Sequence, residues 1–241
     1  RARYSRGRMK EVFWSCPVVP KDLRICKPVL AFGMAKNPNV DDAYAMSSPE
    51  EVKALYRTWS RSYDVVFGES QGYQLPRKVA SAFVGAGGVG PVLDVGAGTG
   101  LVGGALRRMN VKDIDGIDLS EDMLEVARMK GDYRGLYAGD VTRPLDLIDA
   151  PYMGVVSAGT FTLGHVGPAA LQNLLDVAAS GALFVISVND AHYMSAGFAA
   201  AFTEFGDQIT GLTSREVRIY DDRADEEHRS DKARLLVFRK A

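Results

Sequence analysis

The chain has 241 residues, of which 46% are apolar, so it is long enough for one α/β domain with appendages. Its formal net charge of -1 lacks the cationic excess that nucleic-acid binding requires, which makes nucleic acid an unlikely partner. The two cysteines have no metal-ligand spacing, and no apolar run is long enough for a membrane helix or a secretory signal. We therefore expect a cytoplasmic protein without a metal site and without membrane contact.

The first 36 residues differ from the rest. They carry nine basic residues and two acidic ones, and they show neither helical nor strand periodicity. Residues 1–40 are therefore expected to form an irregular basic extension. Three interpretations stay open, namely an arm for an acidic partner, an organelle transit peptide, and upstream or cloning-derived sequence ahead of a start at Met34.

A helical segment is expected next, over residues 41–90. Ser48 followed by Pro49 and two glutamates is a helix-start signal, and apolar residues then recur at helical spacing to residue 67. A second helix is predicted over 75–84, before a cluster of glycines. Together these helices would form a cap next to the main domain.

From residue 91 onward, strand-like and helical runs alternate. Strands are predicted over 91–95, 113–119, 135–140, 152–158 and 182–188, and helices over 101–109, 120–130, 168–179 and 191–205. Two final strands, 216–220 and 233–238, flank a charged loop and read as an antiparallel hairpin at the sheet edge. The pattern predicts an α/β, Rossmann-like, doubly wound domain over 91–241, with a mostly parallel seven-stranded sheet and a terminal antiparallel hairpin.

The most informative motif is LDVGAGTGLVGGAL, in which a buried strand leads into Gly96, Gly98 and Gly100 ahead of a helix. Glycines at such a turn let the backbone approach a ligand, and the following helix presents free N–H groups. The spacing differs from a dinucleotide fingerprint, because Leu101 occupies the position of its third glycine. Asp94 before the loop would repel a pyrophosphate but attract a cationic amine.

Two more carboxylates follow at successive strand ends. Asp118 lies 22 residues after Gly96, where it suits the two hydroxyls of a ribose, and Asp140 lies another 22 residues on, where it suits the exocyclic amine of adenine. Each alone could be a surface acid at a strand end. The three together favour a nucleoside ligand with a cationic amine.

The segments DVGAGTG, GIDLSEDML and AGDVT resemble motifs of class I S-adenosylmethionine-dependent methyltransferases. With TWSRSYD upstream, the arrangement is similar to the branch that includes the methyltransferase-like protein of the Williams-Beuren syndrome region. The resemblance implies S-adenosylmethionine as cofactor and S-adenosylhomocysteine as product, with the upstream Tyr63 closing over the cofactor. The cofactor-binding residues it implies are Tyr63, Asp94, Gly96, Ala97, Gly98, Thr99, Gly100, Asp118, Leu119, Met123, Gly139, Asp140, Val141 and Ser157.

Several of these residues also have purely structural interpretations. Tyr63 fits the core of an amphipathic helix equally well, and Met123 could pack in the core instead of beneath adenine. Ser120 is expected to be a helix N-cap and not a ligand contact, because it precedes EDMLEVAR.

Catalytic residues are harder to assign. A general base would help if the methyl acceptor is a hydroxyl or a protonated amine. His165 follows the fourth predicted strand and is our candidate, together with Tyr63; His192 follows the fifth strand, and His228 lies in the charged hairpin loop. Solvent exposure or backbone capping remains an alternative for His165 and His192.

We expect an enzyme that transfers a methyl group to a small or medium-sized molecule. The fourth strand lacks the Asn-Pro-Pro-Tyr type motif of amide and base methyltransferases. The alternatives are a nonenzymatic protein that binds the cofactor or its product, and an NAD-dependent oxidoreductase. The expected assembly is a monomer or a homodimer.

Overall fold

The computed structural model describes residues 50–51, 55, 64, 70–147, 151–163 and 165–241. All of them belong to one compact unit, Asn37–Ala241. The predicted basic extension 1–40 lies outside the described residues. Of the helix predicted over 48–67, Glu50, Glu51 and Leu55 are described and helical.

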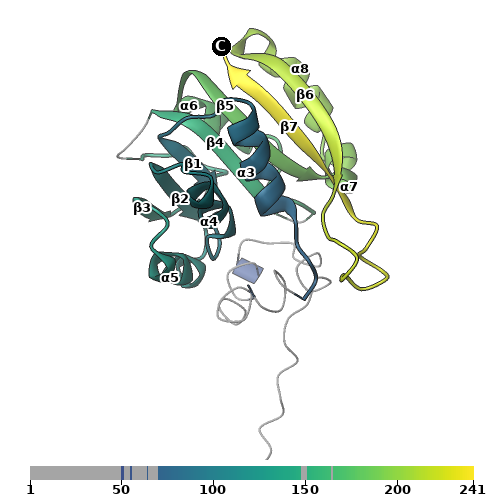
Figure 1. Cartoon of the computed structure of the whole chain (residues 1–241). Coiled ribbons are helices and arrows are strands. Elements are labelled where there is room, and N and C mark those ends of the chain that lie inside the picture. The colour runs from purple at the N-terminus through teal and green to yellow at the C-terminus, as the bar shows by residue number, and fades with distance from the viewer. Residues whose placement is uncertain (1–49, 52–54, 56–63, 65–69, 148–150, 164) are drawn as a thin grey trace, which may run out of the picture. The chain divides into compact units, whose positions relative to one another are not determined.

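A seven-stranded sheet forms the centre of this unit, in the order β3-β2-β1-β4-β5-β7-β6 (Figure 1). The strands are β1 (Val92–Val95), β2 (Ile114–Asp118), β3 (Gly135–Ala138), β4 (Tyr152–Phe161), β5 (Ala178–Asn189), β6 (Ile209–Arg218) and β7 (Lys232–Lys240). Strands β1 to β5 pair in parallel, whereas β7 pairs antiparallel with both β5 and β6. The predicted α/β, mostly parallel sheet with a terminal antiparallel hairpin is confirmed.

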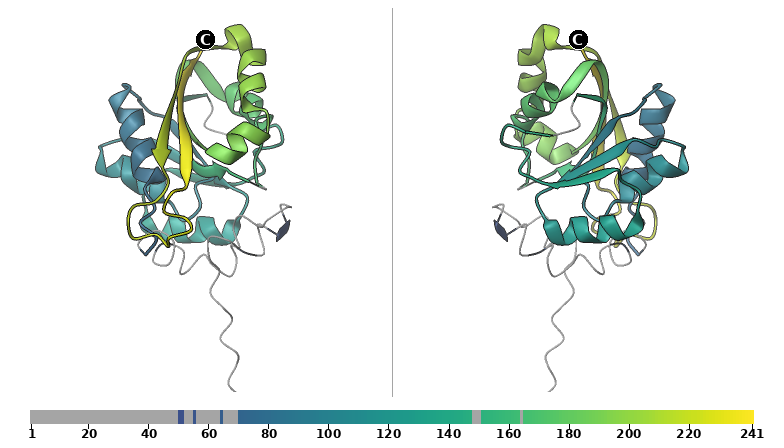
Figure 2. Two further views of the ribbon diagram at one scale, coloured as in Figure 1. Left: turned by 90° about the vertical axis from the view of Figure 1, so that its right-hand side faces the viewer. Right: turned by 90° about the vertical axis from the view of Figure 1, so that its left-hand side faces the viewer.

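Helices cover both faces of the sheet. The helices are α3 (Leu75–Gly85), α4 (Leu101–Arg108), α5 (Glu121–Lys130), α6 (Ala170–Asp176), α7 (Asp190–Ser195) and α8 (Phe198–Phe205). Figure 2 shows α3 and α8 on opposite faces. The helix predicted over 75–84 is confirmed as α3. It was expected to be part of a cap, but it packs on one face of the sheet.

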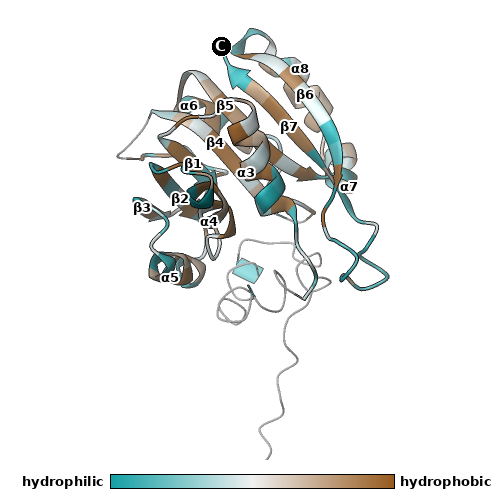
Figure 3. Cartoon of the chain, in the orientation of Figure 1, coloured by the Kyte–Doolittle hydropathy of each residue, from teal (hydrophilic) through white to brown (hydrophobic). Residues whose placement is uncertain are grey.

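Two apolar clusters fill the space between the sheet and its helices. On one face, Val79 and Phe83 of α3 and Leu106 of α4 pack against the sheet. On the other face, Leu174 of α6 and Phe198 of α8 do the same. The inner strands β4 and β5 are mostly brown in Figure 3, whereas β6 is largely white and teal and the loop between β6 and β7 is hydrophilic. Because both faces are covered, the central strands read as continuous apolar runs in the sequence.

Some predicted boundaries were wrong. The helix predicted over 191–205 is two helices, because Gly197 takes a left-handed conformation with φ +80° between them. The helix predicted over 168–179 ends at Asp176, and β5 starts at Ala178 instead of residue 182.

The first hairpin strand was also misplaced. It was predicted over 216–220 but runs over Ile209–Arg218. Strand β6 is the last strand of the sheet, and most of its residues are exposed. When both faces of a strand are exposed to solvent, its apolar and polar residues need not alternate. The alternation that identifies a strand in a sequence is therefore weak in β6.

Among the residues that the structure describes, no helix combines the length and the apolar character that spanning a bilayer would require.

Candidate functional site

The carboxyl ends of the first three strands meet at one edge of the sheet. The pairing of Val95 with Ile117, and of Asp118 with Ala138, sets this register. The loops that follow these strands therefore lie together. Since β6 runs in the same direction as β5, the hairpin loop 219–231 lies at this edge too.

The loop between β1 and α4 contains the predicted glycine motif. Gly96, Gly98 and Gly100 all have positive φ values, of +68°, +53° and +91°. A β-carbon at Gly96 would overlap the side chain of Thr160, so this turn needs glycine for space as well as for conformation. Gly100 is the N-cap of α4 and provides no side-chain cap, which leaves the first N–H groups of the helix without a cap from that position.

Asp118 links the end of β2 to the glycine loop. Its Oδ2 accepts a hydrogen bond of 2.8 Å from Gly98 N, and its Oδ1 accepts one of 2.9 Å from Ser120 N. Burial raises the pKa of Asp118, while these amide donors oppose the shift. The residue is partly exposed, and each carboxylate oxygen keeps a second lone pair for a ligand.

Asp94 lies beneath the loop and is fully buried. Its Oδ2 accepts a hydrogen bond of 2.6 Å from the Tyr133 hydroxyl, whereas its Oδ1 has no hydrogen-bond partner among the described residues. Burial raises the pKa of Asp94 to about 7, and the nearby charge of Asp118 adds to the shift, which the Tyr133 hydrogen bond opposes. The carboxylate therefore titrates near neutral pH.

Two hydroxyls support the loop from β4. Ser157 Oγ and Thr160 Oγ1 each donate a hydrogen bond of 2.8 Å to the carbonyl oxygen of Val95. Ser157 was predicted to bind the cofactor, and the structure places it fully buried behind the loop. In this position it holds the backbone at the end of β1.

The remaining predicted residues are spread around the same edge. Met123 is buried in α5 beside the loop, since its terminal methyl would lie 3.8 Å from a β-carbon at Gly98. Ser120 caps α5, as expected, by accepting from Met123 N at 3.4 Å. Ala97 and Thr99 in the loop are buried, and Leu119 next to Asp118 is partly exposed.

Asp140 follows β3, and its side chain stabilises the turn that leads to Thr142. Its Oδ1 accepts from Thr142 N at 2.9 Å and from Thr142 Oγ1 at 2.6 Å, and Oδ2 is 3.6 Å from Arg143 Nε. Of its neighbours, Gly139 is partly exposed, whereas Val141 belongs to the apolar core. Asp140 therefore organises the loop after β3 and stays partly exposed.

Asp64 is joined to both the loop and α5. Thr99 Oγ1 donates a hydrogen bond of 2.5 Å to Asp64 Oδ1, and Lys130 Nζ forms an ion pair with Asp64 Oδ2. Tyr63, predicted to close over the cofactor, lies outside the described residues.

The three histidines have different environments. His165 is partly exposed after β4, and its backbone N–H donates to Thr162 O at 3.1 Å. The ring Nε2 of His192 is 2.9 Å from the Val166 carbonyl oxygen, so this buried histidine ties α7 to the loop after β4. His228 Nδ1 is 3.1 Å from Asp231 Oδ2 in the hairpin loop.

Tyr133 and Thr160 are the residues that the sequence interpretation missed. The sequence did contain a signal for Tyr133, because Gly103 and Gly116 lie in regular elements where no turn needs a glycine. A β-carbon at Gly103 would overlap the Tyr133 ring, and one at Gly116 would come within 3.0 Å of it. Thr160 had no comparable signal.

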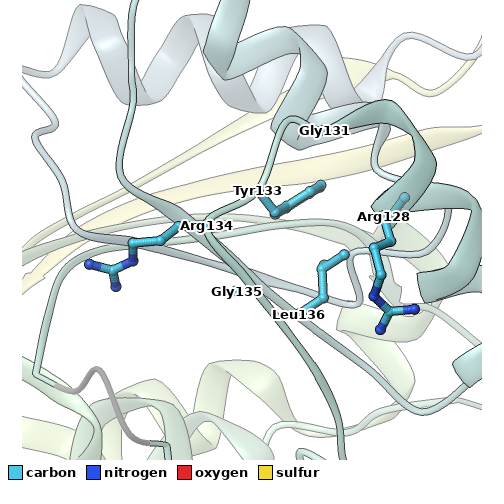
Figure 4. Close-up of a pocket in the computed structure, with 7 residues that line it drawn as sticks. Arg128, Gly131, Tyr133, Arg134, Gly135 and Leu136 are labelled. Carbon is cyan, nitrogen blue, oxygen red and sulfur yellow. The ribbon is translucent and has the colours of Figure 1, made fainter.

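A depression of about 220 Å³ lies behind Tyr133, between the end of α5 and the start of β3 (Figure 4). Arg128 and Arg134 border it, but their guanidinium groups extend away from each other. Arg128 pairs with Glu121, and Arg134 pairs with the buried Asp115. Two of its lining residues, Ala127 and Tyr133, also lie next to the glycine loop, because a β-carbon at Gly100 would come within 3.3 Å of both.

A comparison with protein families finds a match that includes the glycine loop and Asp118. Residues 92–181 match the family model of a methyltransferase domain, from β1 to the start of β5. No curated protein matches the chain.

Solved structures share the fold at low identity. Magnesium protoporphyrin IX methyltransferase from Synechocystis PCC 6803, solved with bound SAM, is 17% identical with a TM-score of 0.56, over 84% of this chain and 100% of that one. The [4+2]-cyclase SpnF is 15% identical with a TM-score of 0.61, over 81% and 97%. A protein described in work on converting a disulfide bond into a thioacetal group in echinomycin biosynthesis is 21% identical, with a TM-score of 0.57 over 80% and 92%.

Proposed function

We propose that this chain is an S-adenosylmethionine-dependent methyltransferase that acts on a small or medium-sized molecule. The observation that carries the proposal is the contact between Asp118 and Gly98, which joins a partly exposed carboxylate to a glycine loop with three positive φ values. The methyltransferase-domain match over residues 92–181 includes both residues.

The residues at this edge fit the parts of such a cofactor. The glycine loop leaves room for a ligand close to its backbone, and Asp118 offers lone pairs to ribose hydroxyls. Asp94 has an oxygen without a partner among the described residues beneath the loop, and a carboxylate there favours a nearby cationic amine. A dinucleotide pyrophosphate would instead meet the carboxylate of Asp94, whereas Asp118 suits the ribose of either cofactor.

The topology also argues against the oxidoreductase alternative. NAD-binding doubly wound folds have the strand order 3-2-1-4-5-6. In this chain an antiparallel strand, β7, lies between β5 and β6. We therefore favour the methyltransferase over the oxidoreductase.

The protein's part in the reaction is mainly positioning. The sulfonium of the cofactor, when bound, makes its methyl group transferable, so a methyltransferase needs few catalytic side chains. In this proposal, Asp118 orients the nucleoside, the loop Gly96–Gly100 orients the amino-acid end, and the loops after β4 and β5 orient the acceptor.

For proton removal from the acceptor, we propose His165, with Tyr63 as the second candidate. His165 follows β4 at the carboxyl edge and is partly exposed, as a base that meets a substrate must be. His192 fits this role less well, because its Nε2 faces the Val166 carbonyl oxygen inside the protein.

Calorimetric titration of the full chain with S-adenosylmethionine, S-adenosylhomocysteine and NAD tests the cofactor. We expect the first two to bind in the micromolar range and NAD to show no binding. Binding of NAD alone would contradict the proposal.

The Asp118→Asn variant tests the site. Loss of the ribose-facing charge is expected to weaken S-adenosylhomocysteine binding by about tenfold or more, because hydrogen bonds to charged groups contribute about 1.5–3 kcal/mol. Asp113→Asn is the matched control, since Asp113 lies just before the same strand, at the opposite edge of the sheet. Equal affinities of the two variants would show that the nucleoside binds elsewhere.

A second candidate function is cofactor binding without methyl transfer. The [4+2]-cyclase among the similar folds shows that this architecture also occurs in a protein named for a different reaction. A screen of small hydroxyl, amine and thiol acceptors, read out by formation of S-adenosylhomocysteine, separates the two candidates. Turnover with any acceptor supports the methyltransferase.

A further inference from the structure

The Tyr133 hydroxyl contacts both ends of the glycine loop. It donates a hydrogen bond of 2.6 Å to Asp94 Oδ2, just before the loop, and accepts one of 3.0 Å from Gly103 N, just after it. Gly103 lies in the first turn of α4, where backbone N–H groups have no partner within the helix. A residue distant in sequence thus provides the cap that Gly100 does not provide.

The glycines around Tyr133 match this arrangement. A β-carbon at Gly103 would overlap the phenol ring, and one at Gly100 or Gly116 would approach ring atoms to 3.0 Å. Gly100 of the loop and Gly103 of α4 therefore make room for the aromatic ring, whereas Gly116 of β2 makes room for Leu136 and Ala97 as well. The backbone at Gly100 and Gly103 thus packs closely against the ring, which fixes the position of its hydroxyl.

The hydroxyl also stays protonated. Burial raises the pKa of Tyr133 well above its usual value, and the adjacent Asp94 raises it further. Tyr133 can therefore donate to Asp94 and accept from Gly103 throughout the physiological pH range.

We propose that Tyr133 is a positioning residue for the cofactor site, because it holds the two ends of the glycine loop at a fixed separation from behind. The inference rests on the proposed function, since it assigns the loop to the cofactor. Tyr133 acts through Asp94 and Gly103 and does not itself contact the ligand. Replacing Tyr133 by phenylalanine would remove the hydroxyl and let the loop open, while the ring would still fill the same space.

The test compares Tyr133→Phe with Tyr152→Phe in the full chain. Tyr152 is the matched control, because it is fully buried in β4 and its hydroxyl also donates to an aspartate, Asp115 Oδ2, at 2.9 Å. Each variant loses one tyrosine–aspartate hydrogen bond, so each is expected to lose a few degrees of melting temperature. Only Tyr133→Phe is expected to change the loop.

Two readouts follow the loop. Hydrogen–deuterium exchange of peptides over residues 95–106, measured without cofactor, is expected to become faster in Tyr133→Phe and to stay at the wild-type rate in Tyr152→Phe. The affinity for S-adenosylhomocysteine is expected to fall about tenfold in Tyr133→Phe alone. Asp94→Asn weakens the same connection from its other end and is expected to show the same exchange pattern.

Unchanged loop exchange in Tyr133→Phe, an equal increase in Tyr152→Phe, or wild-type affinity in Tyr133→Phe would each overturn the inference. Failure of the proposed function looks different, because the wild-type protein would then bind neither S-adenosylmethionine nor S-adenosylhomocysteine. The exchange measurement needs no cofactor, so it tests the role of Tyr133 independently of the proposed function.

Discussion

At the scale of single residues, Asp94 has the most unusual environment in the described structure. It is fully buried, it makes one hydrogen bond to Tyr133, and its second oxygen has no partner among the described residues. An ionised carboxylate in such a place costs free energy unless a cation lies near it. Cofactor binding in the proposed site would supply that cation as the amine.

This environment predicts a pH dependence of stability. Burial raises the pKa of Asp94 from 3.8 to about 7, so between these values the folded state holds a proton that the unfolded state releases. The stabilising contribution of Asp94 to the free energy of unfolding is largest below pH 4. It decreases by up to about 4 kcal/mol as the pH rises towards 7. Asp94→Asn is expected to lack this decline.

Urea unfolding of wild type and Asp94→Asn at intervals from pH 4 to pH 8 measures the difference. The stability of the wild type relative to the variant should decrease across the window. Parallel curves would mean that Asp94 ionises in the folded protein at its ordinary pKa.

At the scale of elements, the third and fourth residues of α4 are two adjacent glycines, Gly103 and Gly104, that have different surroundings. A β-carbon at Gly103 would overlap the Tyr133 ring, whereas one at Gly104 would meet the end of the Asp132 side chain at 3.2 Å and of Arg108 at 3.5 Å. The ring is held by its neighbours, but the ends of flexible side chains move easily. The two positions therefore respond differently to the same substitution.

Gly103→Ala is expected to destabilise the protein by about 1–3 kcal/mol, because overpacking forces the ring or α4 to shift. Gly104→Ala is expected to change stability by between zero and a gain of about 1 kcal/mol, because alanine favours the helix. Chemical denaturation of both variants measures the contrast. Equal effects would indicate that the Tyr133 ring moves freely.

At the scale of the whole described unit, the last strand in sequence is one of the inner strands of the sheet. Strand β7 lies between β5 and β6, and its Phe238 stacks on Phe184 of β5 with ring centroids 4.7 Å apart. Phe202 of α8 packs edge-on against Phe238 at 5.4 Å. The C-terminal residues therefore contribute to the main core, whereas β6 forms the outer strand.

Phe238→Ala is expected to lower the free energy of unfolding by about 3–5 kcal/mol, because it leaves a cavity between β5 and α8. Leu212→Ala in β6 is expected to cost much less, since Leu212 is 41% exposed and exposed substitutions usually change stability by less than about 0.5 kcal/mol. Equilibrium unfolding of the two variants tests this order. A small effect at Phe238 would contradict the placement of β7 in the core.

The sequence by itself predicted the class of fold, the parallel strands and the glycine loop, because these depend on local patterns. Buried strands are continuous apolar runs, and the glycine loop is a short motif between a strand and a helix. It also placed Asp118 at the end of the following strand, at the same edge of the sheet as the loop. The N-cap role of Ser120 was local as well, and it was confirmed.

Only the tertiary structure decided the contacts between segments distant in sequence. It placed Tyr133 between Asp94 and Gly103, and Ser157 and Thr160 behind Val95. It also separated the roles of the strand-end aspartates, because Asp94 is enclosed while Asp118 stays partly exposed. Burial and hydrogen bonding depend on which segments pack together, and no local pattern in the chain records that packing.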